Sequence, residues 1–327
     1  MAIVSRRSPR QWLRAKRARG PSGRPGPIDG VRCGVTRGAR AIPPQNLLEV
    51  TMDTNVISIS RNQSTHSTAF EQALTPESLR ERVPAVFAPG AHERTSKAYT
   101  FISTERVLDG LRQVGFLPVE ARQSTRRVAS PLHARHLIRL RRRFETVQLR
   151  EAVPEIWFLN SHDGTSAYQL RVGLYRAVCT NGLVVSVGTF PVWRIAHRGD
   201  VLEDVVRAAQ EIGERFATLG TAVERMERTM LTQEERLDFA AQACLLRFPR
   251  DRHVAMEPAQ LLVPRRPEDV GGDLWHTLNI VQEGIIAGGL SRRSASGRTT
   301  RTRRITAIRE DVRLNAALWD LAMARAA

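Results

Sequence analysis

A heptad repeat in the second half of the chain constrains the fold more than any other feature of the sequence. Apolar residues follow one another at alternating spacings of three and four, at Leu202, Val205, Ala209, Ile212, Phe216, Leu219, Val223, Met226 and Met230. This seam predicts one long helix, with a capping box at Asp200 and Glu203; a break near Gly220 is an open alternative, because glycine weakens helices. We expect the seam to pack against the following helices of the same chain, and pairing with a second copy is the alternative.

Mostly strand patterns occupy the chain before this helix, and helical patterns follow it. The expected strands are Tyr99–Ser103, Phe116–Arg122, Arg135–Arg143, Glu155–Asn160 and Tyr168–Leu174, with a helix at Thr104–Gln113. Further helices are expected after the caps Thr232, Asp273 and Asp311. Strands first and helices last predict an α+β fold, with a mostly antiparallel sheet in the N-terminal half and a helical C-terminal half that includes the long heptad-patterned helix.

Composition divides the chain into four segments. Residues 1–51 combine eleven basic and two acidic residues with frequent Gly and Pro and no apolar period. We expect a disordered basic arm there, or an extension created by a start site assigned upstream of Met52. Residues 52–84 are expected to be a flexible lead-in, 85–199 a sheet-rich subdomain, and 200–327 a helical subdomain packed on the sheet.

Arginine supplies almost all of the positive charge of the chain, whose formal net charge is +17. In the expected strand 135–143, the period of two places Arg135, Arg139, Arg141 and Arg143 on one face, with Leu137 as the exception. A second cluster lies in a loop broken by Gly and Ser and contains Arg292, Arg293, Arg298, Arg301, Arg303 and Arg304. Guanidinium groups bind phosphate oxygens two at a time, so we expect the loop to fold over the strand and form one phosphate-binding groove. A solvated charged face is the alternative for each cluster.

The turn at 161–166 brings a hydroxyl, an imidazole and a carboxylate together in sequence. Ser161, His162, Asp163 and Thr165, with Asn181, are expected at the edge of the groove. A structural turn at Asp163-Gly164 is the favoured interpretation; catalysis by His162 and Asp163 is an alternative that we rank low, because neighbours in an extended chain point to opposite faces. Asn181-Gly182 is expected to cap a short helix over 176–180, with a hairpin turn as the alternative.

Motifs for metals, nucleotides and membranes are missing from the sequence. The histidines and the three cysteines do not follow a metal-ligand spacing, and neither GxxxxGK[ST] nor GxGxxG occurs. We therefore expect no metal and no cofactor. No stretch approaches the ~20 apolar residues of a membrane helix, so no membrane partner is expected. The widely spaced, odd number of cysteines indicates a reducing, cytoplasmic location.

Four stretches of the chain resemble the YfjQ/YubP-like family of uncharacterised proteins that are carried on plasmids and prophages. They are EIWFLNSHDGTSAY at 155–168, RAVCTNGLVV at 176–185, LWHTLNIVQEG at 274–284 and LNAALW at 314–319. The resemblance covers roughly 85–327. The family is a domain of unknown function, so the resemblance implies a mobile-element setting and little chemistry.

These observations lead to three hypotheses about function. The first is a non-enzymatic DNA-binding protein of a mobile genetic element, which contacts mainly the phosphate backbone and acts in recombination, strand annealing or defence evasion. The second is a hydrolase or nuclease that uses the 161–166 turn. The third is an assembly protein that forms a homo-oligomer through the helix at 202–230.

Overall fold

The computed structural model describes residues 73–326 except 126–129, 146, 148, 150–151, 177–181, 186–189, 249–255 and 294–296. These residues belong to one of the two compact units of the chain, residues 60–327. Residues 1–51 and 52–72, including the expected basic arm, lie outside the described part. The expected cap at Asn181 and the helix before it lie outside it as well.

An antiparallel sheet occupies the first half of the described chain, as the sequence predicts. Its strands are β1 (Phe116–Gln123), β2 (His136–Arg142), β3 (Ala152–Asn160), β4 (Tyr168–Arg176), β5 (Gly182–Val184) and β6 (Trp193–Ile195). The strand order is β1-β2-β3-β4-β5, and β6 pairs with β4 beside β5. Every pairing is antiparallel, which the short connections between consecutive strands allow.

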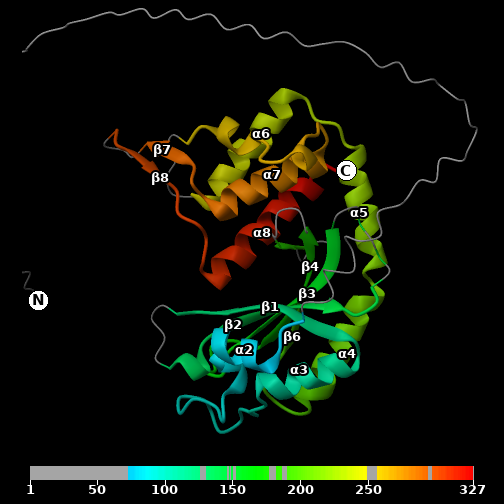
Figure 1. Cartoon of the computed structure of the whole chain (residues 1–327), viewed down its shortest axis with the longest axis vertical. Coiled ribbons are helices and arrows are strands. Elements are labelled where there is room, and N and C mark those ends of the chain that lie inside the picture. Colours follow the sequence, from blue (N-terminus) through cyan, green and yellow to red (C-terminus); the bar gives the residue numbers. More distant parts are fainter. Residues whose placement is uncertain are drawn as a thin grey trace, which may run out of the picture. The chain divides into compact units, whose positions relative to one another are not determined.

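Helices form most of the second half and cover both faces of the sheet. Two helices precede the strands, α2 (Pro76–Arg82) and α3 (Thr104–Gln113), and the others follow them: α4 (Val201–Glu214), α5 (Ala217–Arg228), α6 (Gln233–Arg247), α7 (Leu274–Ala287) and α8 (Ile308–Met323). Figure 1 shows α3 and α4 on one side of the sheet and α7 and α8 on the other. The α+β class predicted from the sequence is therefore confirmed. No helix in the described ranges is long and apolar enough to cross a membrane.

Several helix boundaries follow from the capping residues that the sequence shows. Thr232 and Glu235 form both hydrogen bonds of a capping box at the start of α6. Ser103 accepts a hydrogen bond from the Arg106 amide at the start of α3, and Asp273 accepts one from the His276 amide at the start of α7. These side chains satisfy amides that have no partner inside the helix, so the starts of α3, α6 and α7 are as predicted.

The heptad seam forms two helices instead of the single one expected. α4 ends at Glu214 and α5 begins at Ala217, so the break lies near Gly213 rather than near Gly220. Gly213 packs tightly, because a Cβ there would lie 3.1 Å from the ring of Phe116. The buried seam residues are Val205, Ala209, Ile212, Phe216, Leu219, Val223 and Met226, all in the main core. The seam therefore packs within its own chain, and only its last member, Met230, is largely exposed.

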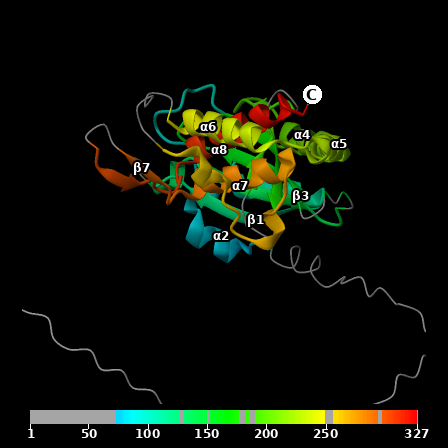
Figure 2. The same ribbon diagram turned by 90° about the horizontal axis from the view of Figure 1, so that it is seen from above.

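Three further local predictions differ from the structure. Tyr99–Ser103 forms no strand; the Tyr99 ring stacks on His197, and the Thr100 amide donates to the His197 carbonyl oxygen at 2.8 Å. α8 begins one turn before Asp311, with Ala307 as its N-cap, because the Asp311 carboxylate is buried against Arg122. The expected basic loop contains a hairpin, β7 (Ser291–Arg293) and β8 (Thr299–Arg301), which projects from the helices in both views (Figures 1 and 2).

The two faces of the sheet are buried differently. Ile138, Leu140, Ile156, Phe158, Leu170 and Val172 belong to the main core, which also contains residues of α3 and α4. The opposite face carries a smaller core with α8, formed by Leu137, Trp157, Leu159, Val184, Ile308 and Val312. Leu137, the exception in the arginine pattern, thus lies where α8 contacts the sheet. The arginine-bearing face is a packed interface rather than an open surface.

The close packing around Gly173 leads to a prediction about this interface. A Cβ at Gly173 would lie 2.6 Å from Cδ1 and Nε1 of Trp157, so Gly173→Ala should force the indole out of position. Overpacking of this kind costs about 1 to 3 kcal/mol, which we expect as a lower free energy of unfolding in urea. Gly90→Ala is the control, because a Cβ at Gly90 has no atom within 4 Å. Equal stability of the two variants would contradict the tight packing.

Candidate nucleic-acid interface

The centre of the arginine row on β2 is buried in a network of ion pairs. The Arg139 guanidinium donates from Nε to Glu155 Oε1 at 2.6 Å and from Nη2 to Oε2 at 2.9 Å, and it also pairs with Glu120. Arg141 Nε lies 3.5 Å from Glu155 Oε2, and its guanidinium carbon lies 3.6 Å from the centre of the Tyr175 ring. The exposed fractions of Arg139 and Arg141 are 3% and 6%. The two side chains therefore hold the interior together and do not present open guanidinium groups to solvent.

Helix α8 covers this network of ion pairs on the face of the sheet opposite the main core. Its residue Asp311 pairs with Arg122, which lies opposite Leu137 on the neighbouring strand. Burial raises the pKa of the Asp311 carboxyl, although the Arg122 charge opposes the rise. The amide of Asn315 donates to Asp311 Oδ1 at 2.7 Å. The expectation of an open row is therefore corrected for its centre, because β2 lies under α8.

The ends of the row are accessible and lie far apart. Arg135 precedes β2 and donates to the Thr165 carbonyl at 3.2 Å. Arg143 follows β2 in an exposed turn, where its guanidinium carbon lies 5.1 Å from the centre of the Phe144 ring. Phe144 is 81% exposed and has a φ of 60°, which is uncommon for a residue with a side chain. Arg135 and Arg143 lie at opposite ends of β2, so they cannot bind the same phosphate group.

Five arginines from four parts of the chain line a cleft between the sheet and α8. The cleft has a volume of about 570 Å³, and we call it the sheet–α8 cleft. Its arginines are Arg135 before β2, Arg171 on β4, Arg194 on β6, and Arg309 and Arg313 on α8. Asp320 is the single carboxylate among the lining residues. Two of the lining residues were predicted from the sequence, Arg135 as a site residue and Thr165 as a residue at the groove edge. The other four arginines were not predicted as site residues.

Arg171 and Arg194 are the closest pair in this cleft. Arg194 lies opposite Gln169, so Arg171 is its diagonal neighbour on the same face of the sheet. Burial lowers the pKa of Arg171, and the positive charge of Arg194 lowers it further. Across the described residues, no carboxylate forms an ion pair with either guanidinium. An anion bound between the two guanidinium groups would therefore reduce their electrostatic repulsion.

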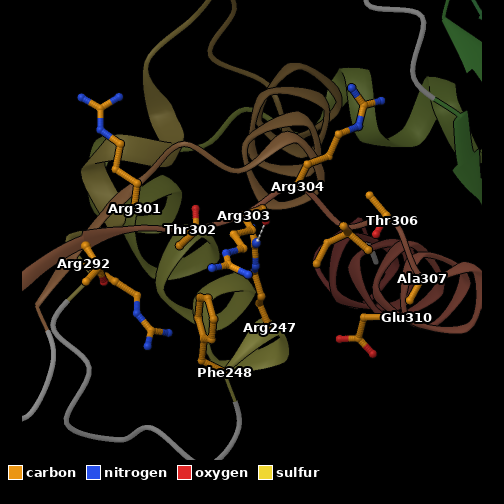
Figure 3. Close-up of a pocket in the computed structure, with 12 residues that line it drawn as sticks. Arg247, Phe248, Arg292, Arg301, Thr302, Arg303, Arg304, Thr306, Ala307 and Glu310 are labelled. Carbon is orange, nitrogen blue, oxygen red and sulfur yellow. Dashed lines mark hydrogen bonds between the residues drawn. The ribbon is translucent and has the colours of Figure 1, made fainter. Parts of the chain in front are cut away.

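The second basic site lies beside the β7–β8 hairpin, in a pocket of about 550 Å³ that we call the hairpin pocket. Its basic residues are Arg247, Arg292, Arg301, Arg303 and Arg304, and Phe248 and Glu310 also line it. Figure 3 shows Arg247 and Phe248 at the centre, while Arg301 and Arg304 point outward. Four of the six predicted loop arginines therefore line one pocket; Arg293 lines a neighbouring one and Arg298 follows the hairpin turn.

Arg247 is a structural residue of the hairpin pocket. Its guanidinium donates to the carbonyl oxygens of Ile285 and Arg303, and so ties α6 to α7 and to the chain after β8. Burial lowers the pKa of Arg247. The negative charge of Glu310 opposes this fall, and the positive charge of Arg292 adds to it. The guanidinium carbon of Arg292 lies 5.2 Å from the centre of the Phe248 ring.

The two basic sites are separated by the first turns of α8. Ala307 and Glu310 line the hairpin pocket, whereas Arg309 and Arg313 line the sheet–α8 cleft. The two sets of lining residues have no member in common, although Glu310 of the first set and Arg313 of the second lie three residues apart and form an ion pair. The strand and loop arginines therefore form two sites rather than the single groove that we expected.

The 161–166 turn is organised by one carboxylate. Asp163 Oδ1 accepts hydrogen bonds from the Ser161 hydroxyl at 2.7 Å, the Thr165 amide at 3.0 Å and the Thr165 hydroxyl at 2.7 Å. Partial burial opposes ionisation, but these hydrogen bonds outweigh it and lower the pKa of Asp163. Gly164 has the positive φ, 76°, that such a turn requires. The turn has the structural role that the sequence favoured.

His162 points away from Asp163 into a buried histidine cluster. His136 Nδ1 lies 2.9 Å from the Ala134 carbonyl and therefore carries the proton, so His136 Nε2 accepts from the Thr104 hydroxyl at 2.8 Å. The same hydroxyl oxygen accepts from Asn160 Nδ2 at 3.1 Å and from His162 Nε2 at 3.1 Å. This arrangement fixes opposite tautomers on the two rings and leaves His162 Nδ1 buried without a partner. The ring is held for structure and is not aimed at Ser161 as a base would be.

The histidine cluster is held in the neutral form. Burial lowers the pKa of His162 to about 2 and that of His136 to about 4, and each ring further disfavours charge on its neighbours. His197, whose ring stacks between Tyr99 and Tyr168, has a pKa lowered to about 4 for the same first reason, burial. Among the described residues, no group of three His, Cys, Asp or Glu side chains could hold a metal ion.

Removing Glu155 tests the ion-pair network. Glu155→Ala leaves Arg139 and Arg141 buried without their shared carboxylate, which should lower the free energy of unfolding by about 3 to 5 kcal/mol in urea denaturation. Glu203→Ala is the control, because Glu203 pairs at 3.8 Å with the exposed Arg207 on the surface of α4. Its effect should stay within about 0.5 kcal/mol. Two equally mild variants would rule out the network as a major source of stability.

The histidine cluster predicts a pH dependence of stability. The folded pKa values of His136 and His162 lie below the unfolded value of 6.5. At a pH between the folded and the unfolded value, the unfolded state therefore binds more protons than the folded state. Stability is therefore full above about pH 6.5 and falls towards pH 4, by about 1.4 kcal/mol per pH unit for each histidine. His162→Gln should reduce this slope by about one histidine in urea denaturation at several pH values. Unchanged slopes would show that His162 is not neutral in the fold.

Comparisons with known proteins give a family and no solved relative. The chain matches the family described as Domain of unknown function (DUF932) over residues 91–319. It is 41% identical over 255 residues to the UPF0380 protein YfjQ of Escherichia coli (strain K12), covering 77% of this chain and 91% of that protein. It is also 41% identical over 257 residues to the UPF0380 protein YafZ of the same strain, covering 78% and 92%. No solved structure matches. The resemblance seen in the sequence agrees with these matches, and the chain belongs to the DUF932 family.

Proposed function

We propose that this chain is a non-enzymatic DNA-binding protein of a mobile genetic element, which holds phosphate groups in the sheet–α8 cleft. One observation carries the proposal: Arg135, Arg171, Arg194, Arg309 and Arg313 line one cleft with a single carboxylate. Arg313 pairs with Glu310 at 2.7 Å, whereas Arg171 and Arg194 form no ion pair among the described residues, so the charges of these two repel each other until an anion binds. The mobile-element setting rests on the resemblance to YfjQ/YubP-like proteins alone.

The chemistry of the cleft favours phosphate over other anions. A guanidinium group offers planar, paired donors that match two oxygens of a phosphate. The cleft contains Thr165, Ser166 and Gln169 as further polar residues and no aromatic side chain for stacking on a base. Contacts of this type position a nucleic-acid backbone and carry little base specificity. The hairpin pocket supplies a second basic surface on the other side of the first turns of α8.

The competing functions have less support from the geometry. His162 hydrogen-bonds to Thr104, whereas Asp163 hydrogen-bonds to Ser161 and Thr165, so the turn does not assemble an acid–base pair. The seam at 202–230 is buried in the main core and offers no apolar face for a homo-oligomer. We therefore place binding, rather than hydrolysis or assembly, at the centre of the proposal.

A salt-dependent titration tests the proposal. Binding of labelled single- and double-stranded DNA, followed by fluorescence anisotropy, should weaken steeply as salt rises, because bound phosphates release counterions. The double variant Arg171→Ala/Arg194→Ala should weaken binding at least about tenfold and lower the log–log salt slope by about 1 to 2. Its melting temperature should not fall, because the two guanidinium groups form no ion pair that the fold would lose.

The control variant is Arg207→Ala/Arg228→Ala, which removes the same charge from exposed positions on α4 and α5. It should keep the affinity within about twofold, since a change in net charge alone acts weakly at a distance in salt. If the two double variants weaken binding equally, net charge and not the cleft is responsible. If the wild-type chain binds neither form of DNA at low salt, the proposed function is wrong.

A further inference from the structure

The Arg171–Arg194 pair is the least compensated charge in the sheet–α8 cleft. Both side chains project from the same face of β4 and β6, next to each other in the ladder. The Nε atom of Arg171 is buried and has no hydrogen-bond partner. A buried donor without an acceptor costs free energy. Arg122 has such an Nε atom as well, but Arg122 pairs with Asp311, whereas Arg171 faces Arg194 in a cleft. An anion that enters the cleft balances the charge of the Arg171–Arg194 pair.

The surroundings define what that acceptor is. Arg309 and Arg313 approach from α8, and Arg135 lies at the wall beside Thr165, so positive charge surrounds the pair on several sides. A phosphodiester inside a strand carries one negative charge and offers two non-bridging oxygens. A phosphomonoester carries nearly two charges near neutral pH and offers three strong acceptor oxygens. The pair matches the monoester better in charge and in number of acceptors.

The shape of the site supports the same ligand. The cleft is bounded by the sheet on one side and by α8 on the other, and Ala316 and Ala317 line the helical wall. Its volume of about 570 Å³ is in the range of pockets that hold a small ligand and is too small to enclose a duplex. A single terminal nucleotide can enter such a cleft, while the remaining strand runs outside it.

We infer that Arg171 and Arg194 bind a phosphomonoester at the end of a nucleic-acid strand, so that the chain recognises phosphorylated strand ends. This inference rests on the proposed function and specifies its ligand. Arg171 and Arg194 each contribute a guanidinium group that lines the cleft. Arg309 and Arg313 add positive charge from α8, and Arg135 does so from the sheet.

The experiment compares one short single-stranded DNA with a 5′-phosphate, a 3′-phosphate or hydroxyl groups at both ends. In anisotropy titrations near neutral pH, one phosphorylated form should bind at least about tenfold more tightly than the hydroxyl form. Arg171→Ala and Arg194→Ala should each abolish this preference, so that each variant binds the phosphorylated and hydroxyl strands with equal affinity. Arg207→Ala, on α4, should keep the full preference.

Two further measurements, a change of pH and competition by free phosphate compounds, distinguish a strand end from other ligands. The preference should shrink when the pH falls to about 6, because the monoester then loses part of its second charge. A mononucleotide or inorganic phosphate should compete only weakly; competition as strong as that of the phosphorylated strand would identify a free phosphate compound as the ligand and overturn the strand-end inference. Equal affinity for phosphorylated and hydroxyl strands overturns the inference but leaves the proposed function intact. Absence of DNA binding overturns both.

Discussion

The buried pair of Arg139 and Glu155 is the interaction on which the central interface depends. Glu155 accepts from Arg139 at 2.6 and 2.9 Å and from the Trp157 indole at 2.6 Å, and it also lies near Arg141. A charge buried under α8 is tolerated only because several donors share one carboxylate. Gly173 and Gly182 leave room for Trp157 and Arg139 in this layer, where any Cβ would collide. Charge pairing and close packing therefore support each other at the same place.

The same face of the sheet shows how position decides the role of an arginine. Arg139, Trp157 and Arg171 lie opposite one another on β2, β3 and β4. Arg139 reaches Glu155 and becomes part of the interior, whereas Arg171 faces Arg194 and the cleft. Identical side chains on one face thus stabilise the fold on β2 and, in the function that we propose, bind an anion on β4. The difference lies in where the acids are, since Glu120 and Glu155 are both used on the β1–β3 side.

Most local structure could be predicted from the sequence, because it depends on neighbours in the chain. The caps Ser103, Thr232 and Asp273 begin helices as expected, and the strand patterns of β1 to β4 correspond to an antiparallel sheet. Predictions failed where a distant residue prevailed over a local signal. Asp311 looks like an N-cap, but Arg122 draws it into a buried ion pair inside the first turn of α8.

The candidate site was harder to predict for the same reason. The period of two correctly placed Arg139 and Arg141 on one face, yet no local pattern indicates that Glu155 and α8 enclose them. Arg171 also alternates with apolar residues, and this was the one signal that could have identified it. Arg194 lies on a strand of three residues, too short for a periodic pattern to be recognised.

By itself, the sequence determined the α+β class, the helix starts at Ser103, Thr232 and Asp273, the amphipathic seam and the excess of arginine. Capping, periodicity and net charge are properties of a few neighbouring residues or of composition, so they are fixed before the chain folds. Only the tertiary structure decided which arginines are neutralised and which meet without acids. That outcome depends on side chains brought together from β2, β4, β6 and α8, and electrostatic energy depends on distance in space rather than on separation in sequence.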